Sequence, residues 1–298
     1  LLNYDMTIFG VKQIYMSDSQ NVVIYPNEQK IILKKNRDFT FAGIVHAGRF
    51  DFFGKEFSFD YDKFIIDLKN VDSLRMMVKS VEKDAYGEYP LVKCKTVIES
   101  INGDLEIDNP ANKSGRKDFP KYPVFNSFKD SYAYYNKKQI QGGKYPKDKF
   151  YFHLEPFQID SLDNFSNAGL NFKGNMVSAS IFPEFKETLV LQPDYSLGFV
   201  TLTPENGFPM YGGKGTYTNK IKLSNQGLRG DGTLNYVTST SKSNDYIFYP
   251  DSTNAIAQQF DVQEQKTTPE FPTTHGEDVR IHWVPYKDVM YAYNNKDK

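Results

Sequence analysis

Apolar and polar residues alternate along much of the N-terminal part of the chain. Within residues 39–68, large apolar side chains occupy every second position in four short runs, and glycine or charged residues separate the runs. A period of two is typical of strands that bury one face. The pattern therefore predicts a meander of four strands, each of four to six residues, with turns at residues 47–48 and at Gly54.

The same alternation returns in residues 215–236. Tyr217, Ile221 and Leu223 alternate with polar residues, and a second strand is expected after the Asn-Gln-Gly triplet at 225–227. Gly230 and Gly232 fall on the apolar face of this second strand. Glycine at such positions marks a bulge or the close approach of another backbone.

One helix is expected, over residues 71–83. Val71, Leu74, Met77 and Val78 fall there at helical spacing. Elsewhere the pattern and the composition favour strands, because 24 Phe and 21 Tyr outnumber the helix-favouring residues, 10 Ala and 17 Leu.

The expected fold is therefore all-β: antiparallel meander strands forming an elongated β-sheet stack, a jelly roll or a solenoid-like sandwich, with at most one or two short helices. Residues 111–126 are rich in proline and charge and lack periodicity, so they are expected to be a linker or long loop. This divides the chain into β-rich regions at 1–110 and 127–298.

Charge and cysteine content exclude several classes of protein. The net charge is −1, with no strongly basic half, so we expect no nucleic-acid partner. The single cysteine, Cys94, allows no internal disulfide and is expected to pack inward on a strand. No apolar run is long enough to predict a transmembrane segment. The sequence starts without Met inside a predicted strand, which suggests a processed form or a fragment.

Motif searches indicate no cofactor and no catalytic residue. The stretch 207–217 contains Gly-Gly-Lys-Gly, but it lacks the spacing and the following helix of a phosphate-binding loop, so we interpret it as a turn. No nucleophile elbow occurs. Tyr132, Tyr134, Tyr135, Tyr145 and Tyr151 flank a Gly-Gly turn and are interpreted as a half-buried seam between two strands.

Acidic residues provide the only metal-site candidate. Asp104, Glu106 and Asp108 would share one face of a strand, a spacing compatible with a calcium ion. The alternative is a solvated face of an edge strand. His275 and His282 are seven residues apart in a strand-like run, which does not fit a zinc site on a helix.

A carbohydrate-active enzyme would need two carboxylates in a cleft. Glu184, Glu187, Asp194 and Glu205 lie in a loop-rich stretch, and nothing in the sequence ranks them. Enzymatic activity is therefore the less favoured interpretation.

Three segments, residues 41–68, 150–165 and 212–236, resemble parts of very large exported proteins of Bacteroidetes-type bacteria. The resemblance lies in strand-and-turn patterns. It implies a location in the periplasm or outer-membrane-associated envelope of a Gram-negative bacterium, and an origin within a longer polypeptide. Ser73, Ser161 and Ser252 follow Asp in triplets similar to the O-glycosylation acceptors of those bacteria.

The glycine-bounded strands are also reminiscent of the folded-over sheets of the AsmA and TamB group and of the Lpt bridge proteins. In such proteins one apolar sheet face holds acyl chains. By this analogy Phe50, Phe52, Phe57, Phe59 and Tyr61 would line a lipid groove, and the alternative is that they fill a closed core.

Two functions are therefore expected from the sequence. The favoured one is a non-enzymatic envelope β-protein, acting as a scaffold or as a segment that binds lipid, other envelope proteins or the rest of a longer chain. The alternative is a carbohydrate-active enzyme or sugar-binding module.

Overall fold

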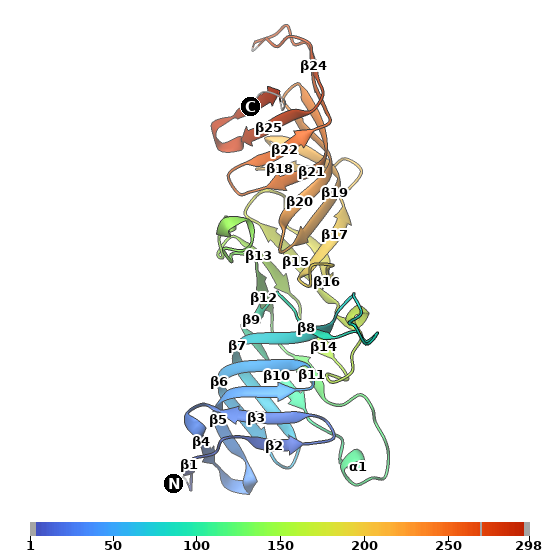
Figure 1. Cartoon of the computed structure of the whole chain (residues 1–298). Coiled ribbons are helices and arrows are strands. Elements are labelled where there is room, and N and C mark those ends of the chain that lie inside the picture. The colour runs from blue at the N-terminus through green and yellow to red at the C-terminus, as the bar shows by residue number, and fades with distance from the viewer. Residues whose placement is uncertain (1–3, 269, 295–298) are drawn as a thin grey trace. The chain divides into compact units, whose positions relative to one another are not determined.

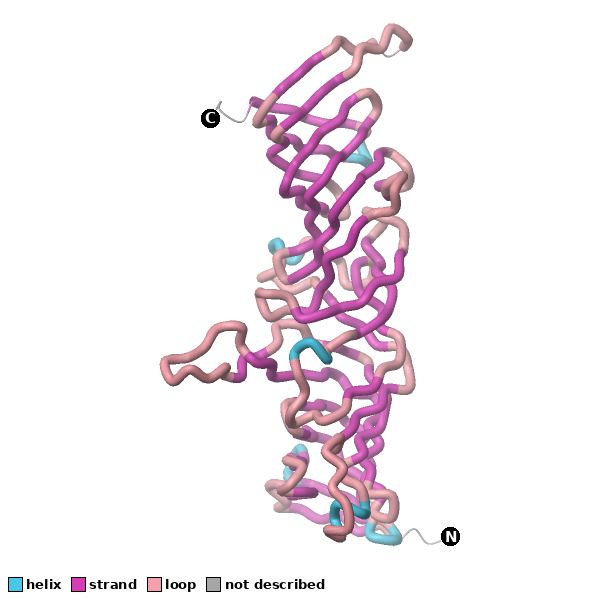
Figure 2. The backbone as a smooth tube through the Cα atoms, turned by 90° about the vertical axis from the view of Figure 1, so that its right-hand side faces the viewer, coloured by secondary structure: helices cyan, strands magenta, loops and turns pink. Residues whose placement is uncertain are grey.

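β-Strands are the main secondary structure of the chain (Figure 1). The computed structural model describes residues 4–268 and 270–294. Strands hold about 54% of the chain and helices about 6%. Figure 2 shows the helices only as short turns between strands. Every strand pair with a described register is antiparallel, which confirms the all-β prediction.

The chain forms two compact units that alternate along the sequence. The first contains residues 1–133, 153–174 and 189–196, and the second contains residues 134–152, 175–188 and 197–298. The segment 111–126 lies in the first unit.

Strands of the first unit are β1 (Met6–Phe9), β2 (Ile14–Ser17), β3 (Val22–Pro26), β4 (Lys30–Leu33), β5 (Phe39–Ala47), β6 (Phe50–Asp60), β7 (Ile65–Lys79), β8 (Leu91–Lys93), β9 (Ile98–Glu99), β10 (Ile101–Glu106), β11 (Val124–Ser127) and β14 (Gln158–Ile159). Its short helices are η1 (Asn27–Gln29), η2 (Lys35–Arg37), α1 (Pro110–Lys113) and η4 (Asn167–Gly169).

Strands of the second unit are β17 (Leu197–Leu202), β18 (Phe208–Met210), β19 (Gly215–Ser224), β20 (Gly227–Tyr236), β21 (Ser239–Phe248), β22 (Thr253–Ala257), β23 (Gln259–Val262), β24 (Thr274–Gly276), β25 (Val279–Val284) and β26 (Val289–Asn294), with the short helices η3 (Gln141–Gly143) and η5 (Pro285–Lys287). Four strands contain residues of both units: β12 (Ser131–Tyr134), β13 (Phe150–Leu154), β15 (Phe172–Ser178) and β16 (Phe185–Leu191).

The sheet of the first unit is a meander. On one side, the start of strand β5 pairs with β4 and the rest of it pairs with β3. On its other side β5 pairs with β6. From β6 the ladder continues through β7, β10 and β11 to β14. Strand β1 extends the sheet beyond β4, and β2 extends it beyond β3.

Strand β7 overturns the prediction of a helix over residues 71–83. It runs for 15 residues, from Ile65 to Lys79. Two β-bulges, one against β10 and one against β6, each insert an extra residue into β7. Consequently the buried residues Leu68, Val71 and Leu74 are three positions apart, a spacing that imitates a helix.

Gly54 was expected in a turn but lies inside strand β6, opposite Gly43. A Cβ atom on Gly54 would lie 2.5 Å from Cζ of Phe57, so the Phe57 ring packs directly over the glycine. The strand therefore continues through the glycine. The predicted four short strands are three longer ones, β5, β6 and β7, while the turn expected at residues 47–48 is confirmed.

Aromatic rings from distant strands meet in the core of the first unit. The ring centroids of Phe52 in β6 and Phe125 in β11 are 4.8 Å apart, although β7 and β10 lie between these strands in the ladder. Phe50 contacts Phe165 at 5.1 Å. The sheet therefore curls so that its apolar face encloses these rings.

The second unit is a meander as well. Strands β19, β20 and β21 pair in order, β22 and β23 pair with successive parts of β21, and β25 pairs with both β22 and β26. The predicted hairpin at residues 215–236 and the bulge at Gly230 and Gly232 are confirmed. The atom nearest to a Cβ on Gly230 would be the Tyr217 hydroxyl oxygen, at 2.3 Å, so a side chain fills this space.

No helix in the described part of the chain is long and apolar enough to cross a membrane.

Replacing Gly54 with alanine tests the packing of rings over glycines. The added methyl group would overlap the Phe57 ring, which is buried against Phe41. We expect Gly54→Ala to lower the free energy of unfolding by about 2 kcal/mol, measured by urea titration with circular dichroism. Gly169→Ala in the same unit is the control, because its nearest non-neighbouring atom would be 3.6 Å away. Equal stability of the two variants would contradict this role of Gly54.

Candidate functional site

The aromatic residues predicted to line a lipid groove are mostly core residues. Phe50, Phe52, Phe57 and Phe59 are at most 4% exposed. Only Tyr61 is exposed, at 40%, and its ring lies beside the Arg37 guanidinium. Because the sheet curls around these rings, the structure favours a closed core over a lipid groove.

The acidic residues proposed to bind calcium do not gather at one point. Asp104 and Glu106 lie on the same face of β10, where Nδ2 of Asn126 donates to both carboxylates at 3.0 Å. Asp108 lies beyond the end of the strand, is 7% exposed and accepts hydrogen bonds from Asn109 and Asn112. Within the described residues no group of three His, Cys, Asp or Glu side chains could hold a metal ion.

The three serines proposed as glycosylation acceptors lie in different settings. Ser73 lies within strand β7, opposite Phe53. The Ser161 hydroxyl donates to the carbonyl of Pro120 at 3.1 Å. Ser252 is 6% exposed, and its hydroxyl donates to Asp251.

Several interpretations as structural residues are confirmed. The Gly-Gly-Lys-Gly stretch forms the turn of the hairpin β18–β19. Cys94 is buried, as expected, but it follows strand β8, which ends at Lys93, and does not lie on a strand. Tyr145, interpreted as half-buried, is instead fully buried and lies between β12 and β13 along the chain; its hydroxyl donates to the carbonyl of Phe248 and accepts from the N–H of Leu228.

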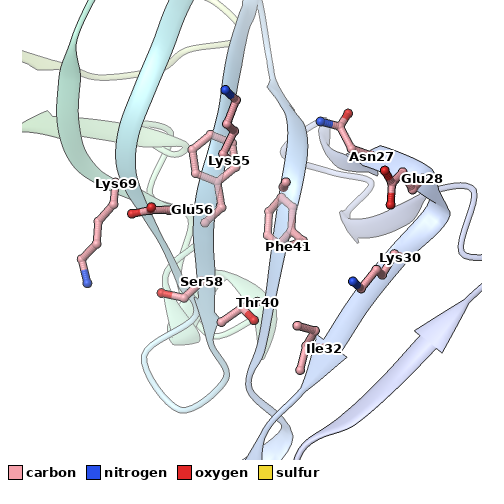
Figure 3. A pocket seen from close by; sticks show the side chains of 12 residues that line it. Asn27, Glu28, Lys30, Ile32, Thr40, Phe41, Lys55, Glu56, Ser58 and Lys69 are labelled. Carbon is pink, nitrogen blue, oxygen red and sulfur yellow. The ribbon is translucent and has the colours of Figure 1, made fainter.

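A large hollow lies on the first unit, over strands β4 to β7 (Figure 3). It has a volume of about 690 Å³. Lys30 extends from β4, Lys55 and Glu56 from β6 and Lys69 from β7, while Thr40 and Ser58 lie between them on β5 and β6. Ile32 and Phe41 also line it, so the hollow is a mainly polar site on a sheet face, with short hydroxyl side chains between longer charged ones.

A line of short polar residues crosses the sheet at this site. Thr40 is directly opposite Ser58, Ser58 is opposite Asp67, and the line continues through Asp104 to Asn126. We call these five residues the polar row. Neighbouring strands are about 4.8 Å apart, so the row spans about 19 Å.

A second hollow, of about 580 Å³, continues along the polar row. It shares Ser58 and Lys69 with the first hollow and also contains Asp67 and Asp104. Phe128 borders this second hollow and is 58% exposed. The two hollows therefore form one trough across strands β4, β5, β6, β7 and β10.

Hydrogen bonds and ion pairs hold the side chains of the trough in place. Nζ of Lys69 lies 3.0 Å from a carboxylate oxygen of Asp67. Nδ2 of Asn70 donates to Glu56 at 2.9 Å, and the backbone N–H of Asn70 donates to the Asn102 side chain. The trough is therefore largely preformed.

The surroundings also shift the pKa of two carboxyl groups in the trough, those of Asp104 and Asp60. Burial raises the pKa of the Asp104 carboxyl, the hydrogen bond from Asn126 opposes this rise, and the negative charges of Glu106 and Asp67 add to it. Hydrogen bonds from Lys63 lower the pKa of Asp60.

The sequence did not predict the trough. Thr40, Ser58 and Asp67 are polar members of alternating runs, so the pattern places them on the face opposite the apolar one. Their alignment depends on strand register, which the alternation does not specify.

Comparison with known proteins gives no relative. No protein-family model, curated protein or solved structure is significantly similar to this chain.

The raised pKa of Asp104 predicts a pH-dependent effect of Asp104→Asn. Ionised Asp104 destabilises the folded state above its raised pKa, and this penalty disappears below its unfolded pKa, about 3.9. We expect the variant to be more stable than the wild type at pH 7 and equally stable near pH 3, measured by urea titration. Asp72→Asn, at an exposed position in the same sheet, is the control. A less stable Asp104→Asn variant at pH 7 would contradict the prediction.

Proposed function

We propose that this protein is a non-enzymatic β-protein of the Gram-negative cell envelope, which holds a rigid sheet and binds an extended polar ligand in the trough of its first unit. The observation that carries the proposal is the polar row, of which four members, Thr40, Ser58, Asp67 and Asp104, lie directly opposite one another and line the two adjoining hollows. The resemblance of residues 41–68, 150–165 and 212–236 to exported envelope proteins supports the location.

The trough suits binding without a change in the backbone. Its floor consists of paired strands, whose backbone groups already form the ladder hydrogen bonds of the sheet. A ligand on this face therefore contacts side chains, and no backbone segment has to become ordered when it binds.

Polar ligands fit this face better than acyl chains. Charged, hydroxyl and amide groups make up most of the lining of the trough. Ile32, Phe41 and Phe57 also line the first hollow, but Phe41 and Phe57 are at most 5% exposed. An acyl chain in the trough would cover these polar groups without hydrogen bonding to them, which costs free energy.

A second candidate function is glycoside hydrolysis. Asp67 and Asp104 are directly opposite in the β7–β10 ladder, and Cβ atoms in such pairs are about 5 Å apart. Retaining glycosidases place two carboxyl groups about 5 Å apart, one of them with a raised pKa. Asp67 is also paired with Lys69, which favours a structural role for this carboxylate.

Chemical labelling of lysines tests the proposed binding face. The whole chain would be acetylated with and without isolated Gram-negative cell-wall material, and separately with phospholipid vesicles, and labelling would be read by mass spectrometry. We expect the cell-wall material to protect Lys30, Lys55 and Lys69, because a ligand in the trough covers their ammonium groups. Lys222 and Lys242, exposed in the second unit, are the internal controls.

Two results would contradict the proposal. One is protection of the trough lysines by vesicles alone, which would indicate a lipid surface. The other is unchanged labelling of all three lysines by the cell-wall material. Release of reducing sugar ends during the incubation would favour the hydrolase instead.

A further inference from the structure

We infer that the ligand of the trough is a neutral glycan chain, an inference that rests on the proposed binding function of this face. The trough is elongated, as a site for a polymer must be. Its two hollows, of about 690 and 580 Å³, share Ser58 and Lys69 and follow one line of side chains across the sheet.

The balance of charges disfavours a polyanion. The two hollows together contain equal numbers of lysines and carboxylates: Lys30, Lys55, Lys63, Lys69 and Lys129 against Glu28, Glu56, Asp60, Asp67 and Asp104. An acidic polymer would meet repulsion from Asp67 and Asp104 on the floor as well as attraction to the lysines at the rim.

The hydrogen-bonding groups match a chain of hydroxyls. Each sugar hydroxyl donates one hydrogen bond and accepts others. Asp67 and Asp104 accept, Lys55 donates, and the hydroxyls of Thr40 and Ser58 do both. Donors and acceptors therefore both line the trough, as a polyhydroxylated ligand requires.

Phe128 provides an apolar surface beside these polar groups. Its ring is 58% exposed, and its backbone N–H donates to the carbonyl of Asn102 at 2.8 Å, which fixes the residue beside β10. One face of a sugar ring carries mainly C–H groups, and an exposed aromatic ring can pack against such a face. An aromatic ring next to paired carboxylates distinguishes a glycan site from a site for a small ion.

Affinity electrophoresis of the whole chain tests the inference. The protein would migrate through native gels that contain a soluble β-glucan, a mannan or a xylan, with alginate as the acidic polymer. We expect at least one neutral polysaccharide to retard the protein and alginate to leave it unretarded.

Phe128→Ala should raise the apparent Kd about tenfold, because the stacking surface is lost. Asp67→Asn should weaken binding as well, because an amide replaces an ionic acceptor.

Tyr86→Ala is the matched control, because Tyr86 is 92% exposed in the same unit and lies outside both hollows. It should bind like the wild type, and circular dichroism melting would check that every variant is folded.

Three results would overturn the inference. They are wild-type binding by Phe128→Ala, stronger retardation by alginate than by the neutral polysaccharides, and no retardation by any neutral polysaccharide. If the trough lysines are still protected by cell-wall material in that case, only the glycan assignment fails. If that protection is also absent, the proposed function fails too.

Discussion

The packing of an aromatic ring over a strand glycine is the interaction on which both units depend. Phe57 covers Gly54, Phe125 covers Gly103, Tyr217 covers Gly230 and Trp283 covers Gly215. Each glycine leaves room for a ring to lie close to the strand, and burial of these rings contributes much of the hydrophobic stabilisation. A chain rich in Phe and Tyr and poor in Ala and Leu can thereby build a dense core from strands alone.

This packing also explains where the candidate site lies. Because the rings occupy the buried face of the sheet in the first unit, the opposite face carries the polar members of each alternating run. Paired backbones hold these polar side chains in line at the strand spacing. The trough is therefore a consequence of sheet register, and its rigidity comes from the same ladders that enclose the core.

Bulges adjust this arrangement locally. The extra residues in β7 shift the phase of its alternation, so that Leu68, Val71 and Leu74 all reach the core in spite of a spacing of three. The shift also sends Asn70 outward, where its side chain donates to Glu56 at the trough. A feature that looks like a helix in the sequence thus contributes to the polar face of a sheet.

The sequence by itself determined the all-β class, the hairpins around residues 47–48 and 225–227, and which side chains alternate between two faces, because a period of two is a local property of the chain. Only the tertiary structure decided that the aromatic side chains of β6 are buried and that Thr40, Ser58, Asp67, Asp104 and Asn126 form one row. Both outcomes depend on register and curl between strands far apart in sequence, and alternation restricts register only to steps of two residues.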